Sequence, residues 1–244
     1  MPGTAVERLT AAIQTAVEAP GDRAACWHLA EMVAADWSAS PIGHGDGYSD
    51  ADLDVVAATL GHPFPAALRE AYKLFGQRDD LTRNQDPFAS LAELEIREDA
   101  LVFRTENQGV CWWGVLLSDV DKDDPPTVLG ADLADESGKK WTPWTDRLST
   151  ALVDMLMMEA VLSEEDEDML EFWQPGDEST LVSGLRPLPS LMPESCQSSW
   201  FIGDDVLVHV LGGGWTTVRA RTPEAMAAFN GDDEDDDDEY SPLY

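Results

Sequence analysis

Hydrophobic periodicity changes near residue 100, and this change constrains the fold more than any other feature of the sequence. Before that point, apolar side chains recur every three or four positions, which is the spacing of amphipathic helices. The segments 101–105 (LVFRT) and 110–116 (VCWWGVL) are instead rich in β-branched and aromatic residues, and the tetrad 106–109 (ENQG) separates them like a turn. Helices followed by a strand–turn–strand unit predict an α+β fold, with a mixed, largely antiparallel sheet flanked by helices.

Helical patterns recur four times before this change. The first begins with a capping box of Thr4 and Glu7, whose side chains can satisfy the opening backbone donors, and it ends at Pro20. We expect a second helix after Asp22, followed by a polar, glycine-rich loop. Two more helices are expected beyond that loop, over residues 53–60 and 66–75.

The second half of the chain predicts further strands around one long helix. A strand is expected at 127–129, and a helix from about Thr145 should bury a stripe of Leu and Met residues as core filling. Segments 205–211 and 215–221 are typical of a hairpin whose strands are joined by three glycines, and a short helix follows them. Residues 163–200 show no clear periodicity.

These patterns predict a main α+β domain with an extension at each end. We expect an N-terminal helical extension over residues 1–40, the main domain over 49–229 and an acidic tail over 231–244. The tail contains the run GDDEDDDDE, whose like charges repel one another, so we expect it to be disordered.

The charge balance limits the kinds of partner. The chain has 48 acidic residues and 15 Lys and Arg residues, which gives a net charge of −33. Such a chain is repelled by nucleic acids and by anionic membranes, so we expect neither as a partner. A basic protein would be attracted, although the acidity also suits a protein that only needs to stay soluble. No signal peptide and no apolar run of about 20 residues is visible, and we expect a cytoplasmic location.

The sequence contains no recognisable catalytic or metal-binding motif, and we expect neither an enzyme nor a cofactor. The glycines 212–214 precede a strand rather than a helix N-terminus, so they do not form a phosphate loop. The four histidines lack metal-ligand spacing. The three cysteines lie far apart, and Cys111 is interpreted as a small core residue.

Several ordered motifs resemble those of the SUKH superfamily, which unites fungal cell-wall-synthesis regulators with bacterial toxin-immunity proteins. The resemblance covers residues 51–162 well and 200–229 loosely, and Thr127 departs from the usual branched apolar residue. The matching segments are Gly61–Tyr72 (GHPFPAALREAY), Asp80–Asp86 (DLTRNQD), Glu106–Val110 (ENQGV), Trp113–Val115 (WGV) and Asp123–Val128 (DDPPTV).

The resemblance implies an α+β fold without catalytic residues or a cofactor, and a function in binding. Many bacterial members look like immunity proteins that neutralise a cognate toxin. Our leading hypothesis is therefore an immunity-type protein that occludes a toxin, such as a basic toxin domain. The alternative is a general protein-interaction or regulatory scaffold without a toxin partner. The sequence leaves the oligomeric state open.

The motif residues are the candidate partner-binding residues. Trp112 and Trp113 are adjacent on a strand, so their side chains should point to opposite faces of the sheet, one inward and one nearer the surface. The polar residues of the turn could instead satisfy local backbone groups, and that alternative stays open. The candidate residues are Glu106, Asn107, Gln108, Trp112, Trp113, Asp123 and Asp124.

Overall fold

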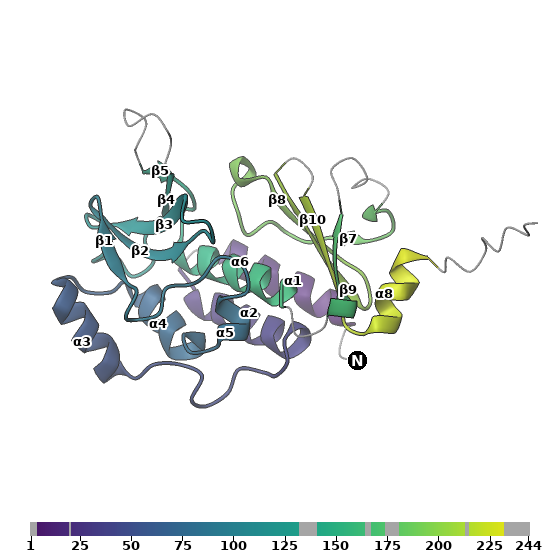
Figure 1. Cartoon of the computed structure of the whole chain (residues 1–244), viewed down its shortest axis with the longest axis horizontal. Coiled ribbons are helices and arrows are strands. Elements are labelled where there is room, and N and C mark those ends of the chain that lie inside the picture. Colours follow the sequence, from purple (N-terminus) through teal and green to yellow (C-terminus); the bar gives the residue numbers. More distant parts are fainter. Residues whose placement is uncertain are drawn as a thin grey trace, which may run out of the picture.

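The computed structural model describes residues 4–19, 21–131, 141–163, 167–173, 181–212 and 215–231. Within these ranges, helices and two five-stranded antiparallel sheets form the fold, and the sheets lie side by side above the helices (Figure 1). The α+β class is therefore confirmed. Every strand pairing is antiparallel, and the strands form two sheets where the sequence pattern suggested one mixed sheet.

The N-terminal helices follow their sequence signals closely. The capping box of Thr4 and Glu7 is present at the first helix. The third helix begins three residues before the expected Leu53, because Ser49 and Asp52 form a second capping box, and Gly61 ends it in the left-handed conformation. The bounds are α1 Ala5–Glu18, α2 Arg23–Trp37, α3 Asp50–Leu60, α4 Ala66–Phe75 and α5 Asp79–Thr82.

The first sheet contains the strand–turn–strand unit that the sequence predicted. Its strands follow the chain in the order β1-β2-β3-β4-β5, and a register shift between Val102 and Arg104 interrupts the β2–β3 pairing. The expected strands at 101–105, 110–116 and 127–129 correspond to β2, β3 and β4. The bounds are β1 Glu95–Arg97, β2 Ala100–Thr105, β3 Cys111–Leu116, β4 Val128–Ala131 and β5 Thr142–Pro143.

The second sheet joins the predicted hairpin to β6, β7 and the start of β8, which lie in the stretch 163–200 that the sequence left unassigned. Its order is β6-β10-β9-β8-β7, so β10 inserts beside β6, and α8 follows β10. The predicted β9–β10 hairpin is confirmed by the pairing of Leu211 with Trp215. The bounds are β6 Leu170–Trp173, β7 Arg186–Pro187, β8 Ser198–Ile202, β9 Val206–Leu211, β10 Trp215–Ala220 and α8 Pro223–Asn230, with single turns η2 Glu167–Met169 and η3 Glu194–Cys196.

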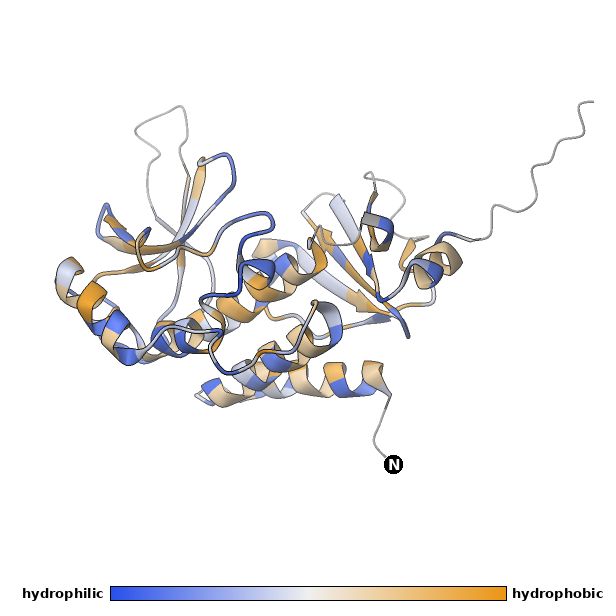
Figure 2. Cartoon of the chain, turned by 60° about the horizontal axis from the view of Figure 1, so that its bottom comes forward, coloured by the Kyte–Doolittle hydropathy of each residue, from blue (hydrophilic) through white to orange (hydrophobic). Residues whose placement is uncertain are grey.

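Helix α6 (Leu148–Val161) is the central element of the fold. The sequence predicted one buried stripe, but every residue of this helix except Met158 is buried. The cause is its position, because it lies over the other helices and beneath the two sheets (Figure 1). A helix that is apolar on all sides requires such a position. Figure 2 shows the hydrophobic residues along α6 and the strands, with hydrophilic stretches in the connecting loops.

The N-terminal helices α1 and α2 belong to the main body. Leu9, Ile13 and Leu29 lie in the same core cluster as Leu152 of α6. The glycine-rich loop after α2 is not a boundary either, because Arg78 donates to the carbonyl oxygen of Ser40 at 2.9 Å. Helices α1 and α2, which make up most of the expected extension over residues 1–40, are therefore part of the core rather than an appended unit. The acidic tail beyond residue 231 lies outside the described residues.

One buried carboxylate joins α6 to the segment that follows α5. Glu159 has no exposed surface, and its side chain accepts hydrogen bonds from the backbone N–H groups of Asn84, Gln85 and Asp86 at 2.7, 2.8 and 3.0 Å. Arg104 of β2 adds an ion pair to Glu159 at 3.1 Å. We call these residues the Glu159 cluster. Because a buried charge requires such partners, the cluster fixes three segments relative to one another.

Replacing Glu159 should therefore destabilise the chain strongly. We expect Glu159→Gln to lower the free energy of unfolding by about 3–5 kcal/mol, because it removes the buried charge that three amides share and leaves Arg104 with only its longer pair to Asp86. Urea unfolding measures this difference. Glu95→Gln is the control, since the exposed Glu95–Arg97 pair should contribute less than about 1 kcal/mol. Equal effects of the two substitutions would contradict this account.

Candidate functional site

The ENQG motif forms the turn between β2 and β3, and its glutamate is used inside the turn. The carboxylate of Glu106 accepts hydrogen bonds from the backbone N–H groups of Gln108 at 3.0 Å and Val110 at 3.2 Å. Gly109 has a φ of +73°, a conformation that favours glycine. The side chains of Asn107 and Gln108 are exposed. The turn is thus stabilised by Glu106, and the side-chain amides of Asn107 and Gln108 can contact a partner.

The turn is attached to the core through the Glu159 cluster. Asp86 accepts a hydrogen bond from the backbone N–H of Asn107 at 3.1 Å, and its second carboxylate oxygen lies 3.4 Å from Arg104. Two segments of the SUKH resemblance, 80–86 and 106–110, therefore meet in space. This contact gives Asp86 a structural role but uses only the backbone of Asn107.

The two adjacent tryptophans point to opposite faces of the first sheet, as expected. Trp112 is half-buried, and the guanidinium of Arg97 stacks on its ring at 4.1 Å. Trp113 packs against the core, with Trp144 edge-on at 6.3 Å and Arg104 stacked at 4.7 Å. Trp112 is therefore the tryptophan nearer the surface.

The two adjacent aspartates differ in their surroundings. Asp124 is largely buried, and its carboxylate accepts hydrogen bonds from the backbone N–H of Ser149 at 2.8 Å and from Arg147 at 3.0 Å. This arrangement stabilises the N-terminus of α6. Asp123 has 80% of its side chain exposed and lies 3.8 Å from Arg23. Asp123 is thus available to a partner, whereas Asp124 has a structural role.

A group of exposed aromatic and aliphatic residues lies on the second sheet, and no sequence pattern indicated this group. Trp215 and Phe172 are 61% and 64% exposed, and Leu211 is 37% exposed. Leu211 pairs directly with Trp215, and Phe172 pairs with Thr217, so alternation places all three side chains on one face of the sheet. We call these three residues the aromatic patch. Two of them flank the glycine turn, and Phe172 lies in the unassigned stretch, so only strand register brings them together.

The same face of the second sheet carries a buried polar cluster against α6. Trp200 donates a hydrogen bond to Asp154 at 3.0 Å, and its ring stacks on His209 at 4.2 Å. The Ser198 hydroxyl lies 2.9 Å from Nε2 of His209. Burial raises the pKa of Asp154 to about 6, while the hydrogen bond from Trp200 and the charge of Arg104 oppose this shift. Burial, assisted by the charge of Arg104, lowers the pKa of His209 to about 4.

The Ser198–His209 contact does not support hydrolytic catalysis. A general base works best with a pKa near the working pH, and the lowered pKa of His209 makes it a weak base. Asp154 accepts its hydrogen bond from Trp200 and does not orient the imidazole ring. The cluster is therefore explained by the packing of the second sheet on α6.

The described ranges contain no assembled metal site and no membrane-crossing helix. No three His, Cys, Asp or Glu side chains in the described ranges gather where they could hold a metal ion. Among the same residues, no helix combines the length and apolar character needed to cross a membrane. The three cysteines are unpaired, and Cys111 is half-buried rather than fully inside the core.

Comparison with known proteins finds no match: no family model, no curated protein and no solved structure is similar to this chain. The SUKH resemblance therefore stays a prediction from the motifs. The structure brings the turn residues and the two tryptophans together on one hairpin, because both belong to the β2–β3 unit. It places the two aspartates elsewhere: Asp124 binds the start of α6, and Asp123 lies beside Arg23 of α2.

The opposite pKa shifts of Asp154 and His209 predict opposite effects of pH on stability. Between about pH 4 and 6, folded Asp154 holds a proton that the unfolded chain has released, so its contribution to stability falls as pH rises. As pH falls from 6.5 towards about 4, the unfolded chain protonates His209 first, so its contribution falls on acidification. Each effect is on the order of 3 kcal/mol, and the two nearly cancel.

Asp154→Asn should therefore expose the histidine effect. Relative to wild type, this variant should lose stability as pH falls from 6.5 to 4, whereas His209→Gln should gain stability over the same range. Urea unfolding at a series of pH values measures both. Glu171→Gln is the matched control, because its carboxylate also accepts an indole N–H, from Trp173 at 3.0 Å, but is half-exposed. Parallel pH profiles for all four proteins would refute the opposing pair.

Proposed function

We propose that this chain is an immunity-type binding protein that occludes a basic protein partner, such as a toxin domain, with the aromatic patch at the centre of the contact. The observation that carries the proposal is the clustering of the exposed side chains of Trp215, Phe172 and Leu211 on one face of the second sheet, beyond the part of that face that is buried against α6. Soluble proteins tolerate single exposed apolar residues, but a contiguous group is typical of an interaction surface.

The composition of the patch suits a high-affinity contact. Trp is among the residue types that contribute most to binding energy, and hot-spot residues lie together near the centre of an interface. The patch is built on paired strands, so its shape is largely fixed before binding and little entropy is lost. A rigid sheet face with two exposed aromatic rings is therefore a suitable anchor for a folded partner.

The net charge indicates which kind of partner can approach. At −33, the chain attracts a basic surface over distances up to the Debye length, about 8 Å at physiological salt. Such attraction mainly raises the association rate, while apolar anchors slow dissociation. The exposed motif residues Asn107, Gln108 and Asp123 remain candidates for the polar rim of the contact.

Substitution in the patch should weaken partner binding without unfolding the chain. We expect Trp215→Ser to weaken binding of the partner about 30-fold, which corresponds to about 2 kcal/mol for a hot-spot residue. Tagged wild-type and variant chains can be used to isolate partners from the native host, with affinity then measured on the purified pair. Val55→Ser is the matched control, because Val55 is equally exposed at 66% but lies on α3.

Two outcomes would refute the proposal. One is a partner that binds wild type, Trp215→Ser and Val55→Ser equally. The other is a partner that is acidic or is a nucleic acid. Inhibition of the partner's toxic activity by wild type, but not by Trp215→Ser, would separate the immunity function from a scaffold function.

The net charge also leads to a prediction about the kinetics of binding. We expect the association rate constant for the partner to fall by about tenfold or more between low and physiological ionic strength, with a much smaller change in the dissociation rate constant. Stopped-flow or surface plasmon resonance kinetics at several salt concentrations measure both. An association rate that does not depend on salt would remove the electrostatic part of the proposal.

A further inference from the structure

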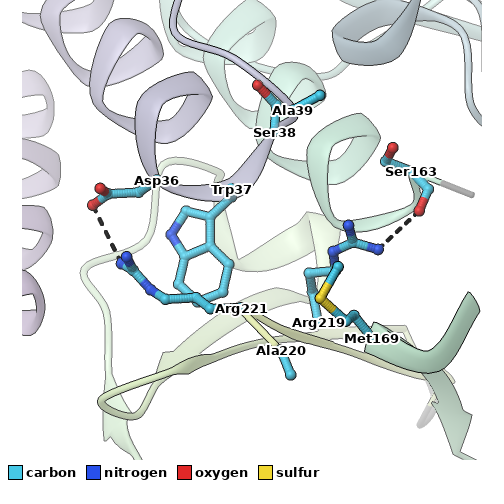
Figure 3. A pocket seen from close by; sticks show the side chains of 9 residues that line it. All are labelled: Asp36, Trp37, Ser38, Ala39, Ser163, Met169, Arg219, Ala220 and Arg221. Atoms are coloured by element: carbon cyan, nitrogen blue, oxygen red, sulfur yellow. Dashed lines mark hydrogen bonds and ion pairs between the residues drawn. The ribbon is translucent and has the colours of Figure 1, made fainter. Parts of the chain in front are cut away.

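A polar cavity of about 240 Å³ lies where strand β10 meets the C-terminal ends of α2 and α6 (Figure 3). Its lining contains two arginines and Asp36, and a second carboxylate, that of Asp205, lies 4.0 Å from Nε of Arg221. We call it the Arg221 cavity. Its lining residues are Asp36, Trp37, Ser38, Ala39, Ser163, Met169, Arg219, Ala220 and Arg221.

Three buried donor atoms in this cavity have no hydrogen-bond acceptor. They are Nε1 of Trp37 and two guanidinium nitrogens of Arg221, Nε and Nη2. Among the described residues, only one other buried side-chain polar atom lacks a hydrogen bond, Nε1 of Trp113. Trp37 is only 3% exposed, so water in bulk does not compensate its N–H. Each such donor costs about 1–3 kcal/mol when it has no acceptor, and this cost requires an explanation.

Asp36 balances the charge of Arg221 without satisfying its hydrogen bonds. Its carboxylate lies 3.3 Å from Nη2 of Arg221, close enough for an ion pair, but the two groups are not aligned for a hydrogen bond. Arg221 stacks on the ring of Trp37 at 4.6 Å, and Figure 3 shows both groups on the same side of the cavity, next to Asp36. The unsatisfied donors of the two side chains are therefore close together.

The opposite wall of the cavity is held by the second arginine. Arg219 is buried and donates a hydrogen bond to the carbonyl oxygen of Ser163 at 2.9 Å, beyond the end of α6. Arg219 lies on β10 and Arg221 directly follows its last residue, Ala220, and Figure 3 shows both arginine side chains on the cavity side. The carbonyl ends of two helices, Asp36 and Asp205 disfavour an anion in this region, and the positive charges of Arg219 and Arg221 oppose that effect.

We infer that the Arg221 cavity binds a small oxyanion, a carboxylate or a phosphate, through Arg221 and the indole N–H of Trp37. A planar guanidinium presents its donors in a fork that matches two oxygens of such a group. The volume equals that of about eight liquid waters at ~30 Å³ each, which suits a phosphate or a short dicarboxylate. This site lies apart from the aromatic patch and does not depend on the proposed partner binding.

The test follows the indole N–H of Trp37 in a ¹H–¹⁵N correlation spectrum of the full chain. The chain has nine tryptophans, and Trp37→Phe assigns the signal by its loss. Inorganic phosphate and succinate are titrated against chloride at constant ionic strength. We expect a saturable shift of the Trp37 signal with at least one of the two oxyanions, and none with chloride.

Three variants locate the binding energy. Arg221→Gln should weaken the oxyanion affinity by tenfold or more, because it removes the charge and the fork. Arg221→Lys should fall between wild type and Arg221→Gln, since it keeps the charge alone. Arg97→Gln is the matched control, because Arg97 also stacks on a tryptophan, Trp112, but lies outside the cavity, and it should bind within about twofold of wild type.

The inference is overturned if the Trp37 signal shows no saturable shift, which would mean that the cavity holds water only. It is also overturned if Arg221→Gln and Arg97→Gln respond as wild type does, which would identify a general salt effect. The titration of wild type decides whether the cavity binds an oxyanion. If Arg221→Gln does not fold, Arg221→Lys takes its place in the comparison with Arg97→Gln.

Discussion

The buried carboxylate of Glu159 is the interaction on which the arrangement of this fold most depends. It accepts three consecutive backbone N–H groups and the guanidinium of Arg104, with no exposure to water. Because α6 supplies Glu159 and β2 supplies Arg104, one cluster joins the central helix to the first sheet. Asp86 extends the cluster to the β2–β3 turn. The turn that bears the ENQG motif is thus positioned from the middle of the molecule.

These internal contacts give several residues of the SUKH-like motifs a structural role. A motif that recurs at ordered positions can reflect binding or folding, and here the internal hydrogen bonds of Glu106, Asp86 and Asp124 account for much of it. Those three carboxylates have protein partners and would have to lose them to contact another chain. The residues left for binding are the exposed ones beside them, and they are few. A surface outside the motifs is therefore the stronger candidate for partner contact.

The sequence predicts those parts of the structure that depend on neighbours along the chain. Thr4 with Glu7 locates the start of α1, and Gly61 locates the end of α3, because capping is decided within one helical turn. Strand β6 gave no such signal, since three of its four residues are half-buried without alternation and its pairing partner, β10, comes from far along the chain. The aromatic patch and the Arg221 cavity join residues distant in sequence, and no local pattern reveals them.

The distribution of cations links the fold to its proposed partner. At least ten Lys and Arg residues in the described ranges form ion pairs within the chain: Arg23, Arg69, Lys73, Arg78, Arg83, Arg97, Arg104, Lys122, Arg147 and Arg221. These cations hold loops and helix ends in place, so they are not available to neutralise the 48 acidic residues elsewhere. The net charge of −33 follows from the composition, and the ion pairs hold most of the few cations at particular internal positions. The negative charge attracts a basic partner, and binding does not require these internal ion pairs to break. Both conditions favour fast association.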